Sequence, residues 1–307
     1  MKQRNFRLVL AALLCALLLL PAVAHADTGP KPSVRVRFTG LGDRLCYATL
    51  LSEKSSTGPS SAYDGNPAHA QYQEICDWCV LDEATWRAFV NYTDPDGYYF
   101  LQEGWQVSDT EELAWTYYPP NRFKVLLYFP DSGAFLSSEK LETYAFHSYF
   151  DADVSAQQLT TSKNQAASDA ASAAIEVERN YRYTAEVVSL LVRIVITLAI
   201  ELLLALLFGL RAKKQFLTVT VVNVVTQVLL NVALFFVNYR SGFLAFTFYY
   251  VLLELAVFAI EAVLFCRLLR RNEAKPSRTR IVLYALCANV TSFAAGLALA
   301  NVIPELF

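Results

Sequence analysis

The chain has 307 residues, of which 55% are hydrophobic, and it carries 26 Lys and Arg against 28 Asp and Glu. The net charge of -2 excludes a basic nucleic-acid binder and a polyanionic tail, so we expect no nucleic-acid partner. Three His and six Cys leave few ligands for a metal centre. Because the chain also lacks a nucleotide loop of the GxxxxGKS type, we expect no cofactor.

The N-terminal residues 1–26 are typical of a secretory signal peptide. Basic residues precede the uncharged run 8–20, which is shorter than the roughly 20 residues that a spanning helix needs. We expect cleavage after Ala26. A lipoprotein anchor at Cys15 is disfavoured, because the residue before it is Leu and the apolar run continues past it.

Residues 27–154 predict one extracytoplasmic domain that is mostly β and sandwich-like. Val34, Val36 and Phe38 alternate with arginines, which is the pattern of a strand with one wet face. Further runs rich in β-branched and aromatic residues cover 45–51, 97–107, 113–118, 122–129 and 143–150. Turn residues separate them, and Asp94-Pro95-Asp96-Gly97 predicts a β-turn rather than a calcium loop. One short helix is expected over 82–92.

Residues 155–186 are expected to form a stalk. Their first part is small and polar and free of aromatic residues, so it can add little to a core. From Ala170 the pattern turns helical, with a charged face formed by Glu176, Glu178, Arg179 and Arg182.

Residues 187–307 predict a four-helix transmembrane domain. The apolar stretches 187–210, 216–237, 243–268 and 281–303 are each long enough to cross a bilayer. The first and third joints collect Lys and Arg, whereas the middle joint has only Arg240, so both basic joints are expected on the cytoplasmic side. This predicts a multipass protein of the cytoplasmic membrane, an α+β membrane protein overall, with its N-terminal domain and its C-terminus extracytoplasmic.

Cys76 and Cys79 are separated by two residues in a segment that is expected to be exported. Two thiols at this spacing form a structural disulfide or a redox pair, and a metal site is a third interpretation. Against the redox interpretation, the surrounding strands look antiparallel, whereas a thioredoxin-type site needs βαβ units. Cys46 is a third exported thiol that could pair with either one.

Aromatic residues are dense in the exported domain. Neighbours along a strand point to opposite faces, so some rings must lie on the wet side. Tyr98, Trp105, Trp115 and Tyr117 are the candidates for a platform that stacks on a glycan or binds a peptide. The alternative is that these rings pack in the core.

Polar residues inside the predicted spans form the remaining candidate site, because such groups are costly in hydrocarbon unless they face partners or water. They are Arg193, Glu201, Asn223, Gln227, Asn231, Glu254, Glu261 and Asn289. Counting from the cytoplasmic ends places Glu201, Asn223, Glu261 and Asn289 at one depth, which predicts a lower polar layer. An upper layer would include Arg193, Asn231 and Glu254, with Arg193 and Glu254 as a buried pair. The layers either bind a proton or cation in a transporter or hold the bundle together by hydrogen bonds.

Several stretches resemble a family of uncharacterised multipass membrane proteins from clostridial-type Gram-positive bacteria. They are TLLSEKSSTGPSSAYDGN, TWRAFVNYTDPDGYYFLQEGW, WTYYPPNRFKVLLY, NVVTQVLLN and YYVLLELAVFAIEAVLF. The resemblance covers most of the mature chain except the stalk. It implies a signal peptide, an exported domain and four spans, and it brings no catalytic residues.

The sequence favours a non-enzymatic envelope protein. No His lies in a predicted span, so intramembrane zinc proteases and Ser/His proteases lack their residues. The leading hypothesis is extracytoplasmic ligand binding or sensing, or an accessory subunit that acts with a membrane partner or as a homo-oligomer. The alternatives are a proton- or cation-coupled transporter and, more weakly, an extracytoplasmic thiol oxidoreductase.

Overall fold

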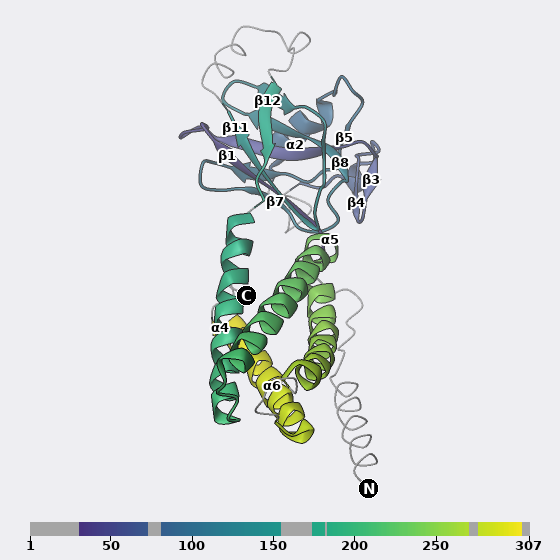
Figure 1. Cartoon of the computed structure of the whole chain (residues 1–307). Coiled ribbons are helices and arrows are strands. Elements are labelled where there is room, and N and C mark those ends of the chain that lie inside the picture. Colours follow the sequence, from purple (N-terminus) through teal and green to yellow (C-terminus); the bar gives the residue numbers. More distant parts are fainter. Residues whose placement is uncertain (1–30, 73–80, 155–173, 182, 270–275, 303–307) are drawn as a thin grey trace. The chain divides into compact units, whose positions relative to one another are not determined.

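The computed structural model describes residues 31–72, 81–154, 174–181, 183–269 and 276–302. The fold is α+β, with a curled, mostly β part followed by long helices (Figure 1). The predicted signal peptide 1–26 and the pair Cys76 and Cys79 lie outside the described residues.

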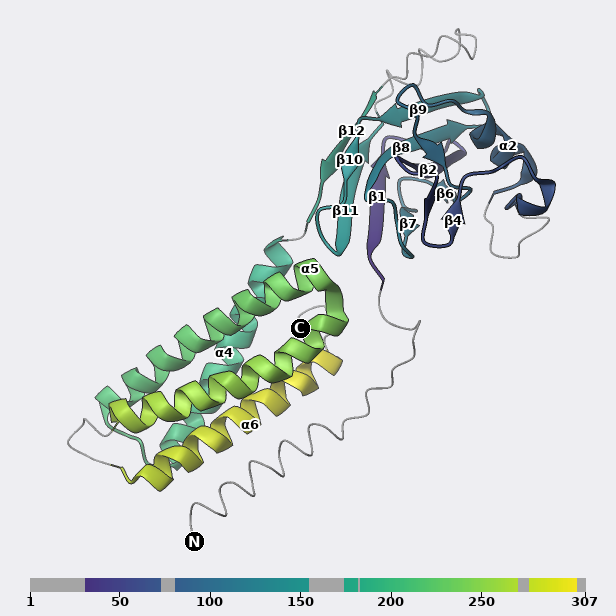
Figure 2. The ribbon, with the colours of Figure 1, turned by 90° about the vertical axis from the view of Figure 1, so that its right-hand side faces the viewer.

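The β part is built on one ten-stranded sheet that curls into a half-barrel (Figure 2). Its main path runs in the order β5, β2, β8, β9, β12, β11, β1, β7, with β10 paired to β8 and β6 to β2. The strands are β1 Ser33–Thr39, β2 Cys46–Ser52, β5 Tyr99–Phe100, β6 Trp105–Val107, β7 Leu113–Trp115, β8 Arg122–Phe129, β9 Ala134–Ser138, β10 Leu141–Glu142, β11 His147–Asp153 and β12 Ala174–Arg179. A separate hairpin pairs β3 Ser56–Thr57 with β4 Ser60–Ser61, and a 3-10 turn, η1, covers Pro67–His69.

The prediction of a two-layer sandwich needs correction, and β12 is the reason. This strand pairs antiparallel with β11 and parallel with β9, so it joins what would otherwise be two sheets. A second parallel pair joins β1 to β11. The sheet is therefore mixed, with two parallel pairs among antiparallel ones.

Residues 174–179, which were expected to be helical, form β12. The segment alternates Ile175 and Val177 with Glu176 and Glu178, which is the two-residue period of a strand with one buried face. Ile175 accordingly lies in the core of the β part. The charged residues that suggested a helical face are the wet side of a strand, and the β part continues to residue 179.

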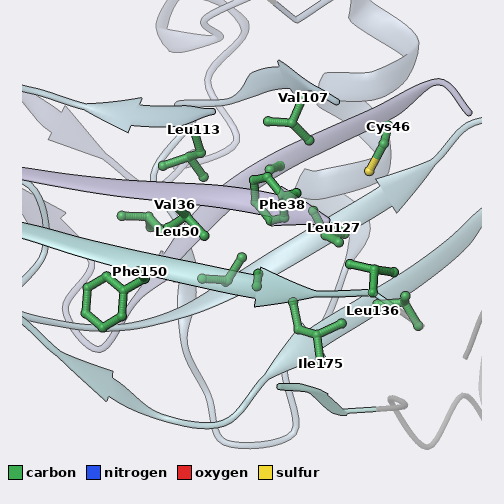
Figure 3. Packing of buried hydrophobic residues seen from close by; sticks show 14 of the residues in the cluster. Val36, Phe38, Cys46, Leu50, Val107, Leu113, Leu127, Leu136, Phe150 and Ile175 are labelled. Carbon is green, nitrogen blue, oxygen red and sulfur yellow. The ribbon is translucent and has the colours of Figure 1, made fainter. Parts of the chain in front are cut away.

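The two central strands, β2 and β8, are buried on both faces. Alternate residues Ala48, Leu50, Val125 and Leu127 enter the interior of the curled sheet, together with Val36, Phe38 and Phe150 from β1 and β11 (Figure 3). The residues between them, such as Leu51 and Leu126, pack on the other face against Trp86 and Phe89 of α2. Because side chains alternate between the two faces of a strand, a strand covered on both sides is continuously apolar.

The short helix α2, Glu83–Asn91, confirms the helix expected over 82–92. Asp82 caps it, since its carboxylate accepts a hydrogen bond of 2.7 Å from the Thr85 amide. The β-turn expected at 94–97 is also present. The Asp94 carboxylate accepts from the amides of Asp96 and Tyr98, and Gly97 adopts a φ of 77°.

Three long helices follow: α4 Tyr183–Leu207, α5 Lys213–Leu268 and α6 Arg278–Val302. Gly242, with φ 75° and ψ -175°, interrupts α5. The two arms of α5 fold back on each other at this point, so that Leu230 and Leu234 of the first arm pack with Val257 of the second (Figure 2). A residue with a side chain would be strained at this φ, which is why glycine stands at the bend.

Candidate functional site

The helices expose many large apolar side chains and bury several polar ones, which differs from the pattern of a water-soluble protein. Large apolar side chains such as Leu207, Leu217 and Leu229 are 73%, 64% and 65% exposed. The interior contains, beside apolar residues, the polar residues Ser189, Glu201, Gln215, Asn223, Thr226, Gln227, Glu261, Asn289 and Ser292. One helical stretch in the described part of the chain, Glu186–Leu207, has the length and apolar composition to cross a membrane.

Glu261, in the second arm of α5, accepts hydrogen bonds on both of its carboxylate oxygens. One carboxylate oxygen accepts a hydrogen bond of 2.5 Å from the Thr226 hydroxyl on the first arm. The other oxygen accepts a bond of 2.8 Å from the Asn289 amide on α6. Both donors therefore stabilise the charged form of Glu261, and they come from two different helical segments.

Glu201, on α4, is as fully buried as Glu261 but is bonded quite differently. Among the described residues, neither of its carboxylate oxygens has a hydrogen-bond partner. Glu261 is close enough to act electrostatically on it. The amide of Asn223, which is also buried, likewise has no bonding partner in the described part of the chain. A buried charge without a partner costs several kcal/mol by typical values, about 3 to 5, so this arrangement requires a further bound species or a proton.

The structure thus brings together all four residues of the predicted lower layer, on three helices. Gln227 is buried one turn from Asn223. Sequence reasoning missed Tyr284, a fully buried residue of α6 whose hydroxyl donates to the Glu201 carbonyl at 3.3 Å. A tyrosine within a predicted span was the available signal, because a buried Tyr hydroxyl normally has a hydrogen-bond partner.

The predicted upper layer is only partly assembled. Arg193 donates to the Asn231 side chain at 3.3 Å, and its guanidinium lies over the Phe246 ring. Glu254 is half-buried and interacts with Tyr250. The pair of Arg193 with Glu254 stays a prediction. Sequence spacing did not predict Tyr250 as a partner of Glu254, nor the hydrogen bond from Arg193 to Asn231.

The predicted aromatic platform is dispersed by the fold. Trp115 is buried in the core, and its indole donates to the Tyr117 carbonyl at 3.0 Å. Trp105 is half-buried and packs against Trp115. Tyr98 is also half-buried and lies beneath the Lys124 ammonium. Of the four candidates, only Tyr117 is exposed, next to Tyr118.

Cys46 is a free thiol in the interior of the β part. Burial raises the pKa of this thiol to about 12. A thiol that remains protonated at neutral pH is a poor nucleophile, so Cys46 is a packing residue. The part of the chain that the structure describes contains no cluster of three or more His, Cys, Asp and Glu suited to a metal ion.

No protein-family model, curated protein or solved structure matches this chain. The function proposed below is therefore based on the geometry of the buried polar residues Glu201, Asn223, Glu261 and Asn289.

Proposed function

We propose that this chain is a multipass membrane protein of the cell envelope. In this proposal α4, the two arms of α5 and α6 cross the bilayer as a four-helix bundle, and the β part and the C-terminus are extracytoplasmic. The exposed apolar side chains on all three helices support it, because lipid is the solvent that such a surface fits. A further support is the placement of Arg211, Lys213 and Arg278 at the joints between α4, α5 and α6.

Within this bundle, we propose that the carboxylates of Glu201 and Glu261 bind and release a proton as part of proton-coupled transport. The observation that carries the proposal is the unequal bonding of the two groups. Glu261 accepts two hydrogen bonds, whereas Glu201, equally buried, accepts none. Two neighbouring carboxylates in a low-dielectric interior do not both ionise, so one proton belongs to the pair. In this proposal the charge is on Glu261, which has the donors, and the proton is on Glu201.

Loss of that proton would have a structural consequence. With the proton gone, two buried negative charges would face each other, and only Glu261 would have donors. The helices would then have to admit water or a cation to Glu201, or separate. Protonation and the opening of the bundle are coupled in this way, which is the requirement for proton-driven transport.

The proposal is tested by proton flux into liposomes that contain the full-length protein and a pH-sensitive dye. Glu201→Gln and Glu261→Gln should each reduce flux at least tenfold. Glu186→Gln, on the same helix as Glu201 but in its first turn and hydrogen-bonded to Tyr181, is the matched control and should retain most of the flux. Equal flux in the parent and both Gln variants, or no flux in the parent, would make the two carboxylates structural.

A second candidate function has its own observation. Tyr117 and Tyr118 are both exposed, and the Lys31 ammonium lies within 6 Å of both ring centres, at 5.7 and 5.3 Å. We propose this surface as the place where an extracytoplasmic ligand, a glycan or a peptide, would bind. Tyr118→Ala should abolish the chemical-shift or fluorescence response to such ligands. A response that survives the substitution would remove this candidate.

A further inference from the structure

A cavity of about 410 Å³ lies between α4 and the two arms of α5. Its lining includes Ser189 and Arg193 of α4, Asn231 of the first arm and Phe246 of the second. The volume is large enough for several water molecules, since one occupies roughly 30 Å³ in the liquid. Ser189 is in the second turn of α4, and Phe246 is in the first turn after the bend at Gly242. In the proposed topology the cavity is therefore in the outer half of the bundle.

Glu254 follows this cavity along the second arm of α5. Phe246, Tyr250 and Glu254 are spaced four residues apart, so they lie at successive turns on one side of the helix. The Tyr250 ring stacks on Phe246, with 6.0 Å between ring centres, and on Phe293 of α6, with 5.4 Å. These two rings hold Tyr250 in place as the partner of the Glu254 carboxylate. One ordered side chain thus separates Glu254 from the lining of the cavity.

On its other side, Glu254 is coupled to the pair of Glu201 and Glu261. Glu261 follows it by seven residues, which is about 10 Å along the axis and nearly the same face. Glu254 acts electrostatically on both members of the pair. It is half-buried, whereas they have no exposed surface. Glu254 is therefore an ionisable group at an intermediate depth between the cavity and the pair.

The first arm of α5 supplies polar groups over the same distance. Asn231, which lines the cavity, donates a hydrogen bond of 2.9 Å to the Gln227 carbonyl, one turn deeper. Thr226, the neighbour of Gln227, donates to Glu261. Polar side chains therefore continue from the cavity to the pair, and they can hydrogen-bond water along the way.

The side of the pair toward the two basic joints is closed by apolar packing. Leu210, Phe265, Leu269 and Ile281 are fully buried in one cluster of the helices. In the sequence these residues stand between the carboxylates and the joints, which are cytoplasmic in the proposed topology. The polar approach to the pair in this structure is therefore from the cavity.

We propose that Glu254 relays protons between the cavity and the pair of Glu201 and Glu261. A hydronium ion in the cavity gives its proton to the Glu254 carboxylate and becomes water. After Glu201 has released its own proton, the Glu254 carboxylic acid passes its proton through water to the pair and becomes a carboxylate again. Only O–H bonds form and break in these steps. Carboxyl groups inside membrane spans serve as such relays in pumps and transporters.

The first test combines proton flux with infrared spectroscopy of the full-length protein in liposomes. Protonated carboxyl groups have a carbonyl band of their own, and the band that Glu201→Gln removes reports the pair. Glu254→Gln keeps the shape of the side chain but cannot carry a proton, so it should lower the flux at least tenfold and leave this band in place. Glu254→Asp should recover part of the flux. Parent-level flux in Glu254→Gln would overturn the relay, and so would loss of the band, because Glu254 would then act by shaping the pair.

Hydrogen–deuterium exchange separates a relay from a structural role. Deuterium on a carboxyl group lowers the frequency of its carbonyl band, so a change of the bath to D₂O measures how fast the proton of the pair exchanges with water. Glu254→Gln should slow this exchange at least tenfold. Tyr250→Phe, which keeps the stacked ring, should slow it by a smaller factor. Tyr249→Phe, at the exposed neighbouring position, is the matched control and should exchange as the parent does. An unchanged exchange rate in Glu254→Gln would refute the relay.

This inference rests on the proposed proton site, and the outcomes distinguish the two. A parent protein with neither proton flux nor a protonated carboxyl band refutes the proton site and the relay together. A parent protein with both, whose Glu254→Gln variant matches it in flux and in exchange rate, refutes the relay alone.

Discussion

Removal of the Lys124 ammonium should destabilise the β part strongly. Its Nζ lies 2.9 and 3.1 Å from the two carboxylate oxygens of Asp94 and 2.6 Å from Asp96. The side chain of Asp94 has no exposed surface. In Lys124→Met, the Asp94 carboxylate would therefore remain buried with two backbone amides as its remaining donors.

The size of the effect follows from this burial. Loss of one partner of a buried ion pair typically costs about 3 to 5 kcal/mol. Asp96 is 41% exposed and keeps Lys140 at 2.9 Å, so only the Asp94 contact is lost without compensation. We expect a loss near the lower end, about 3 kcal/mol. For a part of about 150 residues this corresponds to a fall in Tm of about 6 to 12 °C.

Tryptophan emission is a selective assay, because the four Trp of the chain, at 78, 86, 105 and 115, all precede the helices. Thermal unfolding of the full chain in detergent can therefore be followed for the β part alone. Asp94→Asn combined with Lys124→Met should recover most of the lost Tm, since no charge is then left buried. Lys140→Met, which removes a contact only with the half-exposed Asp96, is the control. The reasoning fails if Lys124→Met is as stable as Lys140→Met.

Three further predictions concern single residues. Burial outweighs the Ser60 hydrogen bond and raises the pKa of Glu103, so the folded state holds this proton more tightly than the unfolded chain does. The protonated Glu103 side chain contributes its full stability below the unfolded pKa of about 4.3, and this contribution is lost as the pH rises through the folded pKa. Glu103→Gln should therefore raise the Tm at pH 7 but not at pH 3.5, as measured by tryptophan emission. Gly209 follows the end of α4 with a φ of 68°, and the Arg280 guanidinium occupies the place where a Cβ would stand. Gly209→Ala should therefore lower the free energy of unfolding by about 1 to 2 kcal/mol, followed by helical circular dichroism. An unchanged thermal melt would contradict this backbone conformation. Cys46, with its pKa near 12, should resist a water-soluble maleimide at pH 7.5 until the β part unfolds, as mass spectrometry can show; rapid labelling of the folded protein would contradict its burial.

Much of the local structure was predictable from short-range pattern. The alternation of Val34, Val36 and Phe38 gave β1, and Asp82 marked the start of α2. The pairing of strands that lie far apart in the sequence could not be predicted from sequence pattern. β12 is a strand because β9 and β11 stand beside it, although its charged residues also suit a helical face. Trp115 is buried for the same kind of reason, since the curl of the sheet decides which face is wet.

The candidate site, likewise, could be predicted from the sequence only in part. Spacing along the helices placed Glu201, Asn223, Glu261 and Asn289 at one depth, because the rise per residue is constant. It could not supply the hydrogen bonds, which depend on the rotation of each helix. Thr226 is the donor to Glu261, and Asn231 accepts from Arg193. The unequal bonding of the two carboxylates could be found only in three dimensions.

In the proposed mechanism, the carboxyl groups of Glu201 and Glu261 share one proton inside the membrane. Infrared spectroscopy of the reconstituted protein observes protonated carboxyl groups directly through their carbonyl stretch, which carboxylates lack. We predict that such a band persists in the parent at pH 7, disappears or shifts in Glu201→Gln and remains in Glu186→Gln. A spectrum at pH 7 without any protonated carboxyl band, or a band that Glu201→Gln leaves unchanged, would contradict the account.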